Sequence, residues 1–348
     1  MTPSPAIEAF LKTIPLFSLV EPPEIMDILR LLRQVNLEQG ETLFTQGEPG
    51  NAMWVLGAGC EVTLSMRPAG GEDVELATLG EGETIGEMAL IDDAGRSATA
   101  TVTSAGVAHR IEAVDFEVLR GAHNPAAFKV MRKMSSDMCQ RLRQISVRIV
   151  SSDGMGRPPD NKVGNFADGT KVEGAQLDAF PGFARLQATV RLALASKLRE
   201  KRFPKGTVLV RHGDPGDSAF MLVEGEVAVQ RRARTLAHLP AGSLFGLISA
   251  VDGGSRSASC VALTDVRVWR LDDKDFDWLF QSGNRFAYQM VDNVARELVS
   301  RLRQANATLV GMSSEPEAET AEEEVVIAEN AANALTDADF EISLELDE

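Results

Sequence analysis

Two regions of the chain consist of short runs in which apolar and polar residues alternate. In the first region the runs are TLFTQG at 42–47, AMWVLGAGCEVTLS at 52–65, VELATLG at 74–80, SATATVTS at 97–104 and GVAHRIEA at 106–113. This period is typical of strands that bury one face. Gly and Pro between the runs, as in GEPG at 47–50, are typical of tight turns. We therefore expect antiparallel strands arranged in a sandwich or roll.

Each set of runs is followed by a stretch with helical periodicity. In the first, Asn124 and Pro125 suit an N-cap and first turn, and apolar residues then recur every three or four positions: Phe128, Met131, Met134, Met138, Leu142, Ile145 and Ile149. In the second, the recurring residues after Asn284 are Val291, Val294, Leu298 and Leu302. We expect two long helices. The methionine-rich face suits a lid over a ligand, or packing against its own sheet or a second subunit, so an oligomer through these helices is one option.

The two regions are copies of one another. Pro15 and Phe17 recur as Pro181 and Phe183, a shift of 166 that persists through GETLFTQGEPGNAMWVLGAGCEV at 40–62 and GTVLVRHGDPGDSAFMLVEGEV at 206–227. Farther on the shift is 160, as shown by RLRQ at 141–144 and again at 301–304, so the second copy is six residues shorter. A register kept over most of both copies indicates an internal duplication.

This organisation predicts a fold class and domain boundaries. We expect an α+β protein, mainly β, with two antiparallel, jelly-roll-like β-roll domains at 1–150 and 179–312, each flanked by helices and ending in a long helix. Residues 151–178 have no periodicity and many Gly, Pro, Asp and Asn residues, so we expect a flexible linker. Residues 313–348 carry thirteen Asp and Glu but no Lys or Arg, which predicts a disordered acidic tail.

The tail also explains the net charge of −16. Without it, residues 1–312 carry 38 acidic and 35 basic residues, or −3, so the folded part is nearly neutral. The tail ends in DFEISLELDE at 339–348, where apolar and acidic residues alternate. Such a segment could pair with the sheet edge of a protein partner, or simply remain solvated.

Composition excludes several classes of function. No run of 18 apolar residues is present to span a membrane, and MTPSPAIEAFLKTIP lacks the features of a signal peptide, so we expect a cytoplasmic protein. Three scattered cysteines and four scattered histidines support neither a disulfide framework nor a metal site. No nucleophile–base set or triphosphate-binding loop appears, so we expect no enzyme. No basic helix-turn-helix follows either long helix, which argues against DNA binding.

The segment GEMALIDDAGRSATA at 86–100 holds the candidate chemistry. Glu87 and Arg96 stand nine residues apart among small and apolar neighbours. One interpretation is an ion pair that braces a loop, although an exposed pair stabilises a fold by only about 0–1 kcal/mol. The other is a pocket for a small anionic ligand. The second copy keeps Arg256 but has Leu247 in the position of Glu87.

These residues resemble the phosphate cassette of the cyclic nucleotide-binding domain, which reads Gly-Glu-(Leu/Met)-(Ala/Gly)-Leu, a short gap and Arg-(Ala/Ser/Thr)-Ala. The resemblance covers about 15–150, including PLFSL at 15–19, and its duplicate covers 181–310. It implies a cyclic nucleotide ligand without a further cofactor. The implied binding residues are Gly86, Glu87, Met88, Ala89, Arg96, Ser97 and Ala98.

The chemistry of these residue types agrees with the roles that the resemblance implies. The guanidinium of Arg96 suits a phosphate, as do backbone N–H groups at the start of a short helix over 88–90. The carboxylate of Glu87 can accept a hydrogen bond from the ribose 2′-hydroxyl. Ser97 stands where bacterial catabolite activators also carry Ser, which favours cyclic AMP over cyclic GMP. The same resemblance points to Ser146 on the long helix as a contact to the base.

The second copy departs from the cassette pattern. Its candidate residues are Gly246, Arg256 and Ser257, but Leu247 cannot accept a ribose hydroxyl, and an unpaired buried hydroxyl costs about 1–3 kcal/mol. We expect the cassette at 246–258 to bind weakly or to be empty. Arg256 would then hold a phosphate or an internal carboxylate.

Together these features predict a non-enzymatic receptor of bacterial type that binds a cyclic nucleotide in its first domain and relays binding to a protein partner. The tandem arrangement resembles the regulatory subunits of cyclic-AMP-dependent protein kinase. The alternative is an interaction scaffold that uses these folds without responding to a nucleotide. The partner is not identified by the sequence.

Overall fold

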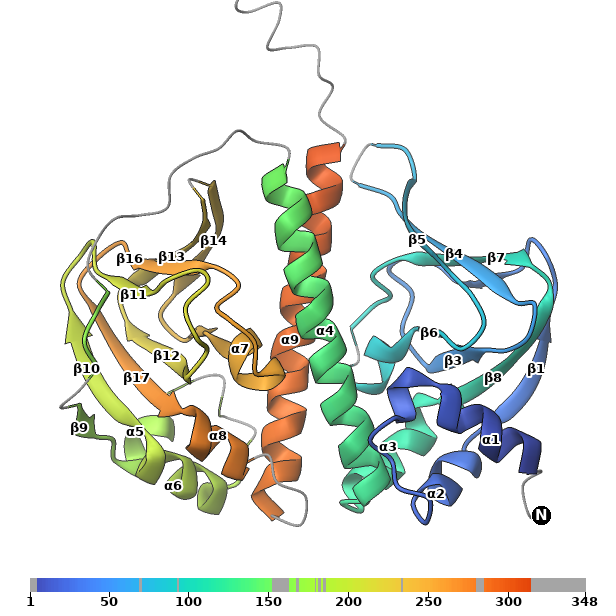
Figure 1. Cartoon of the computed structure of the whole chain (residues 1–348), viewed down its shortest axis with the longest axis horizontal. Coiled ribbons are helices and arrows are strands. Elements are labelled where there is room, and N and C mark those ends of the chain that lie inside the picture. Colours follow the sequence, from blue (N-terminus) through green and yellow to red (C-terminus); the bar gives the residue numbers. More distant parts are fainter. Residues whose placement is uncertain are drawn as a thin grey trace, which may run out of the picture.

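The protein consists of two β-rolls on either side of a central pair of long helices (Figure 1). A computed structural model describes residues 5–68, 71–92, 94–151, 163–166, 169–178, 180, 183, 186–232, 234–279 and 285–313. The tail expected from 313 onward lies outside the described residues except for Ser313. No described helix is both long enough and apolar enough to cross a membrane.

The first domain begins with three short helices and continues into eight strands. The helices are α1 (Pro5–Thr13), η1 (Pro15–Phe17) and α2 (Ile25–Leu29). The strands are β1 (Arg33–Leu37), β2 (Thr42–Phe44), β3 (Ala52–Leu56), β4 (Glu61–Met66), β5 (Val74–Leu79), β6 (Thr84–Ile85), β7 (Thr99–Ser104) and β8 (Gly106–Glu112). They form two antiparallel sheets in the orders β1-β8-β3-β6 and β2-β7-β4-β5. A short 3₁₀ helix, η2 (Glu87–Leu90), lies between β6 and β7, and α3 (Ala113–Gly121) follows β8.

The second domain repeats this strand order. Its strands are β10 (Arg199–Phe203), β11 (Val208–Val210), β12 (Ser218–Glu224), β13 (Glu226–Arg231), β14 (Arg234–Pro240), β15 (Leu244–Phe245), β16 (Ser259–Ala262) and β17 (Val266–Asp272). Its sheets are β15-β12-β17-β10-β9 and β11-β16-β13-β14, where β9 is Thr170–Lys171. Its helices are α5 (Gly174–Asp178), α6 (Ala188–Lys197), α7 (Leu247–Asp252) and α8 (Asp273–Leu279). The expected fold class, with two antiparallel β-rolls, is confirmed.

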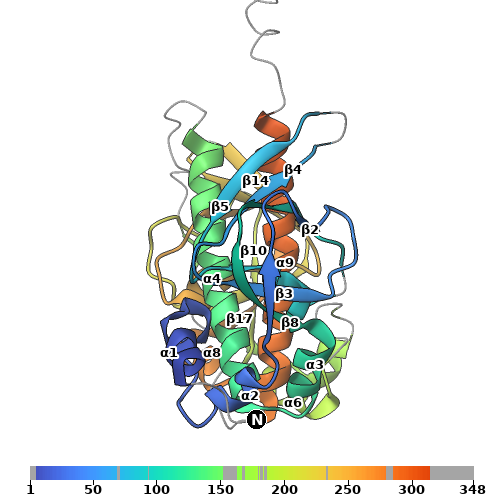
Figure 2. The same cartoon turned by 90° about the vertical axis from the view of Figure 1, so that its right-hand side faces the viewer.

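Two long helices run side by side between the β-rolls, with their carboxyl ends at the same end of the molecule (Figures 1 and 2). They are α4 (Pro125–Ser151) and α9 (Arg285–Ser313). As expected, the Asn124 side chain caps α4 by accepting a hydrogen bond from the backbone N–H of Ala126, at 2.8 Å.

The apolar faces of the two long helices share a single hydrophobic core. The seven apolar residues predicted on α4 are all buried, and the same cluster includes Val291, Val294, Leu298 and Leu302 of α9. The methionine-rich face therefore packs inside the chain. These faces, which were considered as an oligomer contact, are already covered by one another.

Part of the expected linker has secondary structure. Among the described residues of 151–178, Thr170–Lys171 forms β9 and pairs with β10, and 174–178 forms α5. The Phe166 ring lies 4.7 Å from that of Phe203 and 4.8 Å from that of Phe220. Apolar side chains thus attach this part to the second β-roll, and the linker between the domains stays a prediction. Residues 152–162 lie outside the described ones.

The three cysteines lie in the interior of the protein. Cys60, Cys139 and Cys260 are buried and form no disulfide, and desolvation by burial raises the pKa of the Cys139 thiol. Within the described ranges no group of three His, Cys, Asp or Glu side chains could hold a metal ion.

Candidate functional site

A pocket in the first domain lies between its β-roll and both long helices. Its volume is about 350 Å³, which is within the range of about 300–1,000 Å³ common for small-molecule sites. The wall from the β-roll includes Gly86, Glu87, Met88, Ala89, Arg96, Ser97 and Ala98. The structure thus brings together all seven cassette residues predicted for the first copy.

Arg96 is the central charge of this pocket. Its side chain is 6% exposed and lies over the Phe44 ring, with the guanidinium carbon 4.2 Å from the ring centroid. One nitrogen donates to the Gly86 carbonyl at 3.2 Å, and the other donates to the Ala52 carbonyl at 2.8 Å and to the Asn51 amide oxygen at 3.4 Å. These acceptors hold the guanidinium in place and are all formally neutral.

No carboxylate among the described residues pairs with Arg96, and its buried Nε has no hydrogen-bond partner there. Burial, and to a smaller degree the charge of Arg110, lowers the pKa of Arg96 to about 10. A buried cation without a counterion is costly, because desolvation is not repaid by an opposite charge. A ligand anion in the pocket would supply that charge.

Glu87 pairs with a residue of the long helix. The carboxylate is 8% exposed and forms an ion pair with Arg141 of α4. The charge of Glu87 is the largest cause of the raised pKa of Arg141. The interpretation of Glu87 and Arg96 as a brace for their loop is therefore not supported. The ion pair instead joins the cassette to α4.

The small residues of the cassette allow close approach around Arg96. Gly86 has a left-handed backbone, with φ of 74°, and a Cβ added there would lie 2.7 Å from Nη1 of Arg96. Ala89 and Ala98 are buried, and the Ser97 hydroxyl lies 3.8 Å from the Met88 sulfur. The expected short helix is η2, whose first residue is Glu87.

The second domain completes the pocket through α9. Leu302, Arg303, Asn306 and Leu309 of α9 line it together with Arg141, Gln144, Ile145 and Arg148 of α4. Arg303 also donates to the Gly95 carbonyl and pairs with Asp92 at 3.1 Å. The cassette loop of the first domain is therefore held by the helix of the second.

Ser146 is the one predicted residue that the structure does not bring to this pocket. Its hydroxyl donates to the Leu142 carbonyl at 2.7 Å, and Ser146 is not among the lining residues. Asn306, which stands 160 residues farther on, lies in the pocket instead. Because α4 and α9 lie side by side in parallel, the second domain's α9 supplies a polar side chain to the pocket of the first domain.

The arginine of the second cassette is neutralised within the chain. Arg256 pairs with Asp217 at 2.9 Å and donates to the Ser218 carbonyl at 2.6 Å and the Ser249 hydroxyl at 2.8 Å. Burial opposes the charged form of Asp217, yet the Ser218 hydrogen bond and the charges of Arg270 and Arg256 lower its pKa. Arg256 therefore already has the internal carboxylate that was one of its expected partners.

The second cassette leaves little room on its own side of Arg256, although a wide surface hollow of about 650 Å³ borders Arg256 beside Asp217 and Ser218. The cavity beside Gly246, Arg256 and Ser257 has a volume of about 60 Å³, compared with about 350 Å³ in the first domain. Leu247 is 2% exposed and lines this cavity where Glu87 lines the other. A phosphate would have to displace both Asp217 and the Ser249 hydroxyl from Arg256.

The comparison with protein families agrees with the two β-rolls. The model of the cyclic nucleotide-binding domain matches residues 34–123 and 200–282. The chain carries two cyclic nucleotide-binding domains. The matched segments cover the strands of each β-roll and both cassettes.

Several relatives contain domains of this kind. The cyclic AMP receptor protein of Thermus thermophilus is 35% identical over 131 residues, which cover 36% of this chain and 58% of that protein. The cAMP-dependent protein kinase regulatory subunit of Yarrowia lipolytica is 22% identical over 270 residues, covering 76% of this chain and 58% of that one. The matched parts span only 12% to 58% of the curated relatives' own length.

A solved structure shows a weaker likeness. The regulatory domain of Toxoplasma gondii PKA with cAMP is 20% identical, with a TM-score of 0.32, over 81% of this chain and 92% of that one.

Sequence reasoning missed most of the helix side of the pocket, including Arg141, Arg303 and Asn306. The repeated RLRQ motif holds the first two, since Arg141 opens its first copy and Arg303 stands third in its second. Each copy of the motif places two arginines on a long helix, which is a signal for charged partners. The partners themselves depend on how the two helices pack, which the motif does not specify.

Proposed function

We propose that the first cyclic nucleotide-binding domain is a receptor site for a cyclic nucleotide. The observation that carries this proposal is Arg96, a buried cation in a sizeable pocket with only neutral acceptors around it. A cyclic phosphate provides one delocalised negative charge for this guanidinium. The equivalent cation in the second domain, Arg256, is satisfied by Asp217. We therefore expect one ligand for each chain.

The other polar groups of the pocket fit the rest of a nucleotide. Glu87 is fixed by Arg141 and can still accept a hydrogen bond from the ribose 2′-hydroxyl. The base would extend from the cassette toward the long helices, where Ile145 offers an apolar contact and Asn306 an amide. This assignment replaces Ser146 by Asn306 as the contact to the base.

We favour cyclic AMP over cyclic GMP. Ser97 follows Arg96, as in the catabolite activators that the cassette resembles. Relatives named for cyclic AMP and for cyclic GMP both occur, so the choice rests on Ser97 and Asn306. The amide of Asn306 can both donate and accept, so it suits the exocyclic amine and ring nitrogen of adenine. The proposed role is regulatory, because ligand binding is the chemistry that these side chains support.

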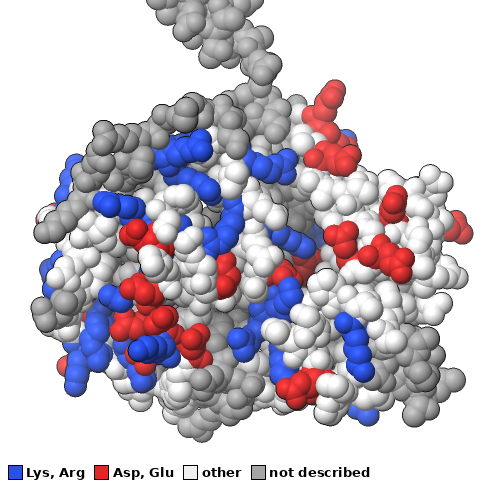
Figure 3. All heavy atoms as spheres, viewed as in Figure 1, with Lys and Arg blue, Asp and Glu red and all other residues white. Residues whose placement is uncertain are grey.

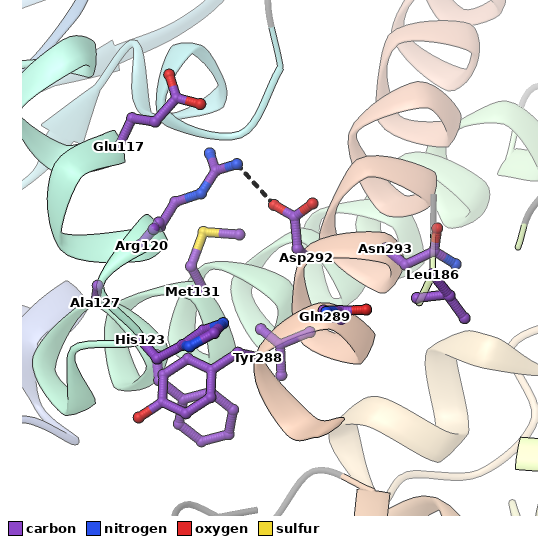
Figure 4. A pocket seen from close by; sticks show the side chains of 13 residues that line it. Glu117, Arg120, His123, Ala127, Met131, Leu186, Tyr288, Gln289, Asp292 and Asn293 are labelled. Carbon is purple, nitrogen blue, oxygen red and sulfur yellow. Dashed lines mark ion pairs between the residues drawn. The ribbon is translucent and has the colours of Figure 1, made fainter. Parts of the chain in front are cut away.

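Two contacts would allow the second domain to respond to ligand binding in the first. Arg303 of α9 holds the cassette loop at Asp92, and Arg120 of α3 joins the Leu90 carbonyl, at the end of η2, to Asp292 of α9 at 2.8 Å. Figure 4 shows Arg120 and Asp292 pointing toward one another across a pocket of about 210 Å³ between α3, α4 and α9.

A ligand that moves η2 or the loop would therefore shift the position of α9. A shift of this kind is limited by the difference in ligand affinity between the two states. The second domain, with its filled cassette, would transmit this change to a protein partner. In this proposal the second domain acts as an interaction scaffold, while the first domain binds the nucleotide.

Calorimetric titration of the full chain with cyclic AMP and cyclic GMP tests the proposal. We expect one site per chain, tighter binding of cyclic AMP, and loss of measurable binding in Arg96→Ala. Arg256→Ala is the matched control, since it removes the equivalent arginine from the filled cassette and should leave binding unchanged. Circular dichroism would verify that both variants fold. If neither nucleotide gives heat at millimolar concentration, the receptor proposal is wrong and the scaffold alternative stands.

A further inference from the structure

The second β-roll carries a cluster of arginines near the carboxyl end of α4. The hairpin of β13 and β14 contributes Arg231, Arg232 and Arg234, with Arg231 opposite Arg234 in the strand register. Arg234 donates to the Ile149 carbonyl of α4 at 3.2 Å, which places the hairpin beside the last turns of α4. We call Arg231, Arg232 and Arg234 the basic hairpin surface. Basic side chains gather over β14 and the upper part of α4 in Figure 3.

Most of this surface has no counterion in the described part of the chain. No described carboxylate forms an ion pair with Arg231 or Arg232. Burial lowers the pKa of Arg231, and the charges of Arg232 and Arg143 lower it further, as expected for cations that repel one another. Arg232 is exposed and so is accessible to a partner.

The matching hairpin of the first domain has the opposite charge. There Arg67 is paired with Asp73 at 2.7 Å, and Glu72 and Glu75 add two further exposed carboxylates. Acidic side chains accordingly lie over the tip of β4 and β5 in Figure 3. Since the same hairpin folds with either charge, the arginines of the second copy are not required by the fold.

One segment of this chain has the complementary charge and begins nearby. Residues 314–348 carry thirteen acidic residues and no basic one, and they follow directly from the end of α9 at Ser313. That end lies beside the end of α4 (Figures 1 and 2). A flexible chain of this length has an end-to-end distance of about 30 Å, enough to reach the hairpin.

The other segment that starts here is a poorer match. Residues 152–162 follow α4 and contain two acidic and two basic residues, so their net charge is zero. Electrostatic attraction therefore selects the acidic tail over this segment. It also directs the tail toward β13 and β14 and away from the acidic hairpin of β4 and β5.

We infer that residues 314–348 dock on the basic hairpin surface of the second domain. The contact is electrostatic and is made within the chain. It covers arginines that would otherwise attract nucleic acid or another polyanion. Because the tail starts at α9, whose side chains line the first pocket, tail docking and the position of α9 act on the same end of the helix pair.

Distance measurements between spin labels test this inference on the full chain. The three native cysteines are buried, so single labels can be attached at Ala237→Cys on β14 and at Asn333→Cys in the tail. We expect a short-distance population at low salt that disappears at about 1 M salt, where the Debye length is about 3 Å. Arg231→Glu with Arg232→Glu should also abolish it.

The acidic hairpin provides the matched control. A label at Glu72→Cys, paired with the same tail label, should give only long distances at any salt concentration. Equal distances from the tail to both hairpins, or distances that do not change with salt, would overturn the inference. Far-ultraviolet circular dichroism would show that the charge-reversed variant remains folded.

A second measurement asks whether another partner occupies the surface. We expect a chain that ends at Ser313 to bind a short DNA duplex about tenfold more tightly than the full chain, because the tail no longer competes. Arg231→Glu with Arg232→Glu should remove this gain. If the full and shortened chains bind DNA equally well, the surface is open in the full chain and the tail does not dock there.

Discussion

The two cassettes share one backbone but differ in how their arginines are satisfied. Gly86 and Gly246 both adopt left-handed φ values, of 74° and 69°, and each leaves room for the arginine ten residues farther on. In the first domain the arginine contacts neutral acceptors beside a pocket of about 350 Å³. In the second, the arginine contacts a carboxylate beside a cavity of about 60 Å³. The fold is therefore compatible with both an open and a filled site.

Four pairs of positions account for this difference. Asn51, Ala52, Glu87 and Ala89 of the first domain correspond to Asp217, Ser218, Leu247 and Ser249 of the second. Three of the second set place a carboxylate, a hydroxyl and another hydroxyl on Arg256. The fourth, Leu247, removes the acceptor for a ribose hydroxyl. Exchanging these residues between the domains would test whether they decide which site is open.

The largest expected effect comes from adding a counterion to Arg96. Asn51→Asp should reproduce the pairing of Arg256 with Asp217, so that the new carboxylate competes with the ligand phosphate. A hydrogen bond to a charged group contributes about 1.5–3 kcal/mol, so affinity for cyclic AMP should fall by up to about a hundredfold. Calorimetry would measure the loss.

Thermal unfolding distinguishes this from damage to the fold. The ligand-free Asn51→Asp variant should be at least as stable as the wild type, because Arg96 gains a partner. Asp217→Asn in the second domain is the control and should leave the affinity of the first site unaltered. An Asn51→Asp variant that binds as tightly as the wild type would show that neutral acceptors around Arg96 are not what opens the site.

A smaller effect is expected at the ribose acceptor. Glu87→Leu copies the second cassette and should weaken cyclic AMP binding by about tenfold, since an unpaired buried hydroxyl costs about 1–3 kcal/mol. Glu87→Gln keeps an acceptor and should lose less.

A ligand without the 2′-hydroxyl tests whether Glu87 contacts the ribose. The affinity of 2′-deoxy cyclic AMP should be nearly the same for the wild type and Glu87→Gln, because this ligand lacks the hydroxyl in question. If Glu87→Leu weakens the binding of cyclic AMP and of 2′-deoxy cyclic AMP equally, Glu87 only orients Arg141 and does not contact the ribose hydroxyl.

The smallest expected effect concerns the contacts between the domains. Arg303 pairs with Asp92 in the first cassette loop, and Arg143 makes the symmetric pair with Asp252 in the second, at 2.7 Å. Arg303→Ala should weaken cyclic AMP binding about three- to fivefold, because the loop at the pocket loses a charged hydrogen bond. Arg143→Ala should leave binding unaltered. Equal losses in the two variants would point to a general loosening of the helix pair.

Periodicity and turn residues predicted most of the fold. The alternating strands, the Gly and Pro turns between them and the cap of α4 at Asn124 all depend on residues that are close in the sequence. The N-terminal helices, β1 and α3 were not predicted, because they form where tertiary packing overrides weak local patterns. The role of the methionine-rich face of α4 was left open between a lid over a ligand, packing on its own sheet and packing on a second subunit, and its pairing with α9 was not predicted. An apolar face identifies the need for a partner but not the partner itself.

The candidate site was predicted on the β-roll side and incomplete on the helix side. Gly86, Glu87 and Arg96 lie in one short segment, so their proximity follows from sequence spacing. Arg303 and Asn306 are more than 200 positions away from Arg96 and reach it only through the packing of the long helices. For the same reason Ser146, which was predicted on α4, does not line this pocket.

A crystal structure of the full chain grown with saturating cyclic AMP tests the central claim most directly. The account predicts one nucleotide per chain, with its phosphate on Arg96, its ribose on Glu87 and its base against α9, while Arg256 remains paired with Asp217. A nucleotide bound at Arg256, or a first pocket that stays empty at saturation, would contradict it.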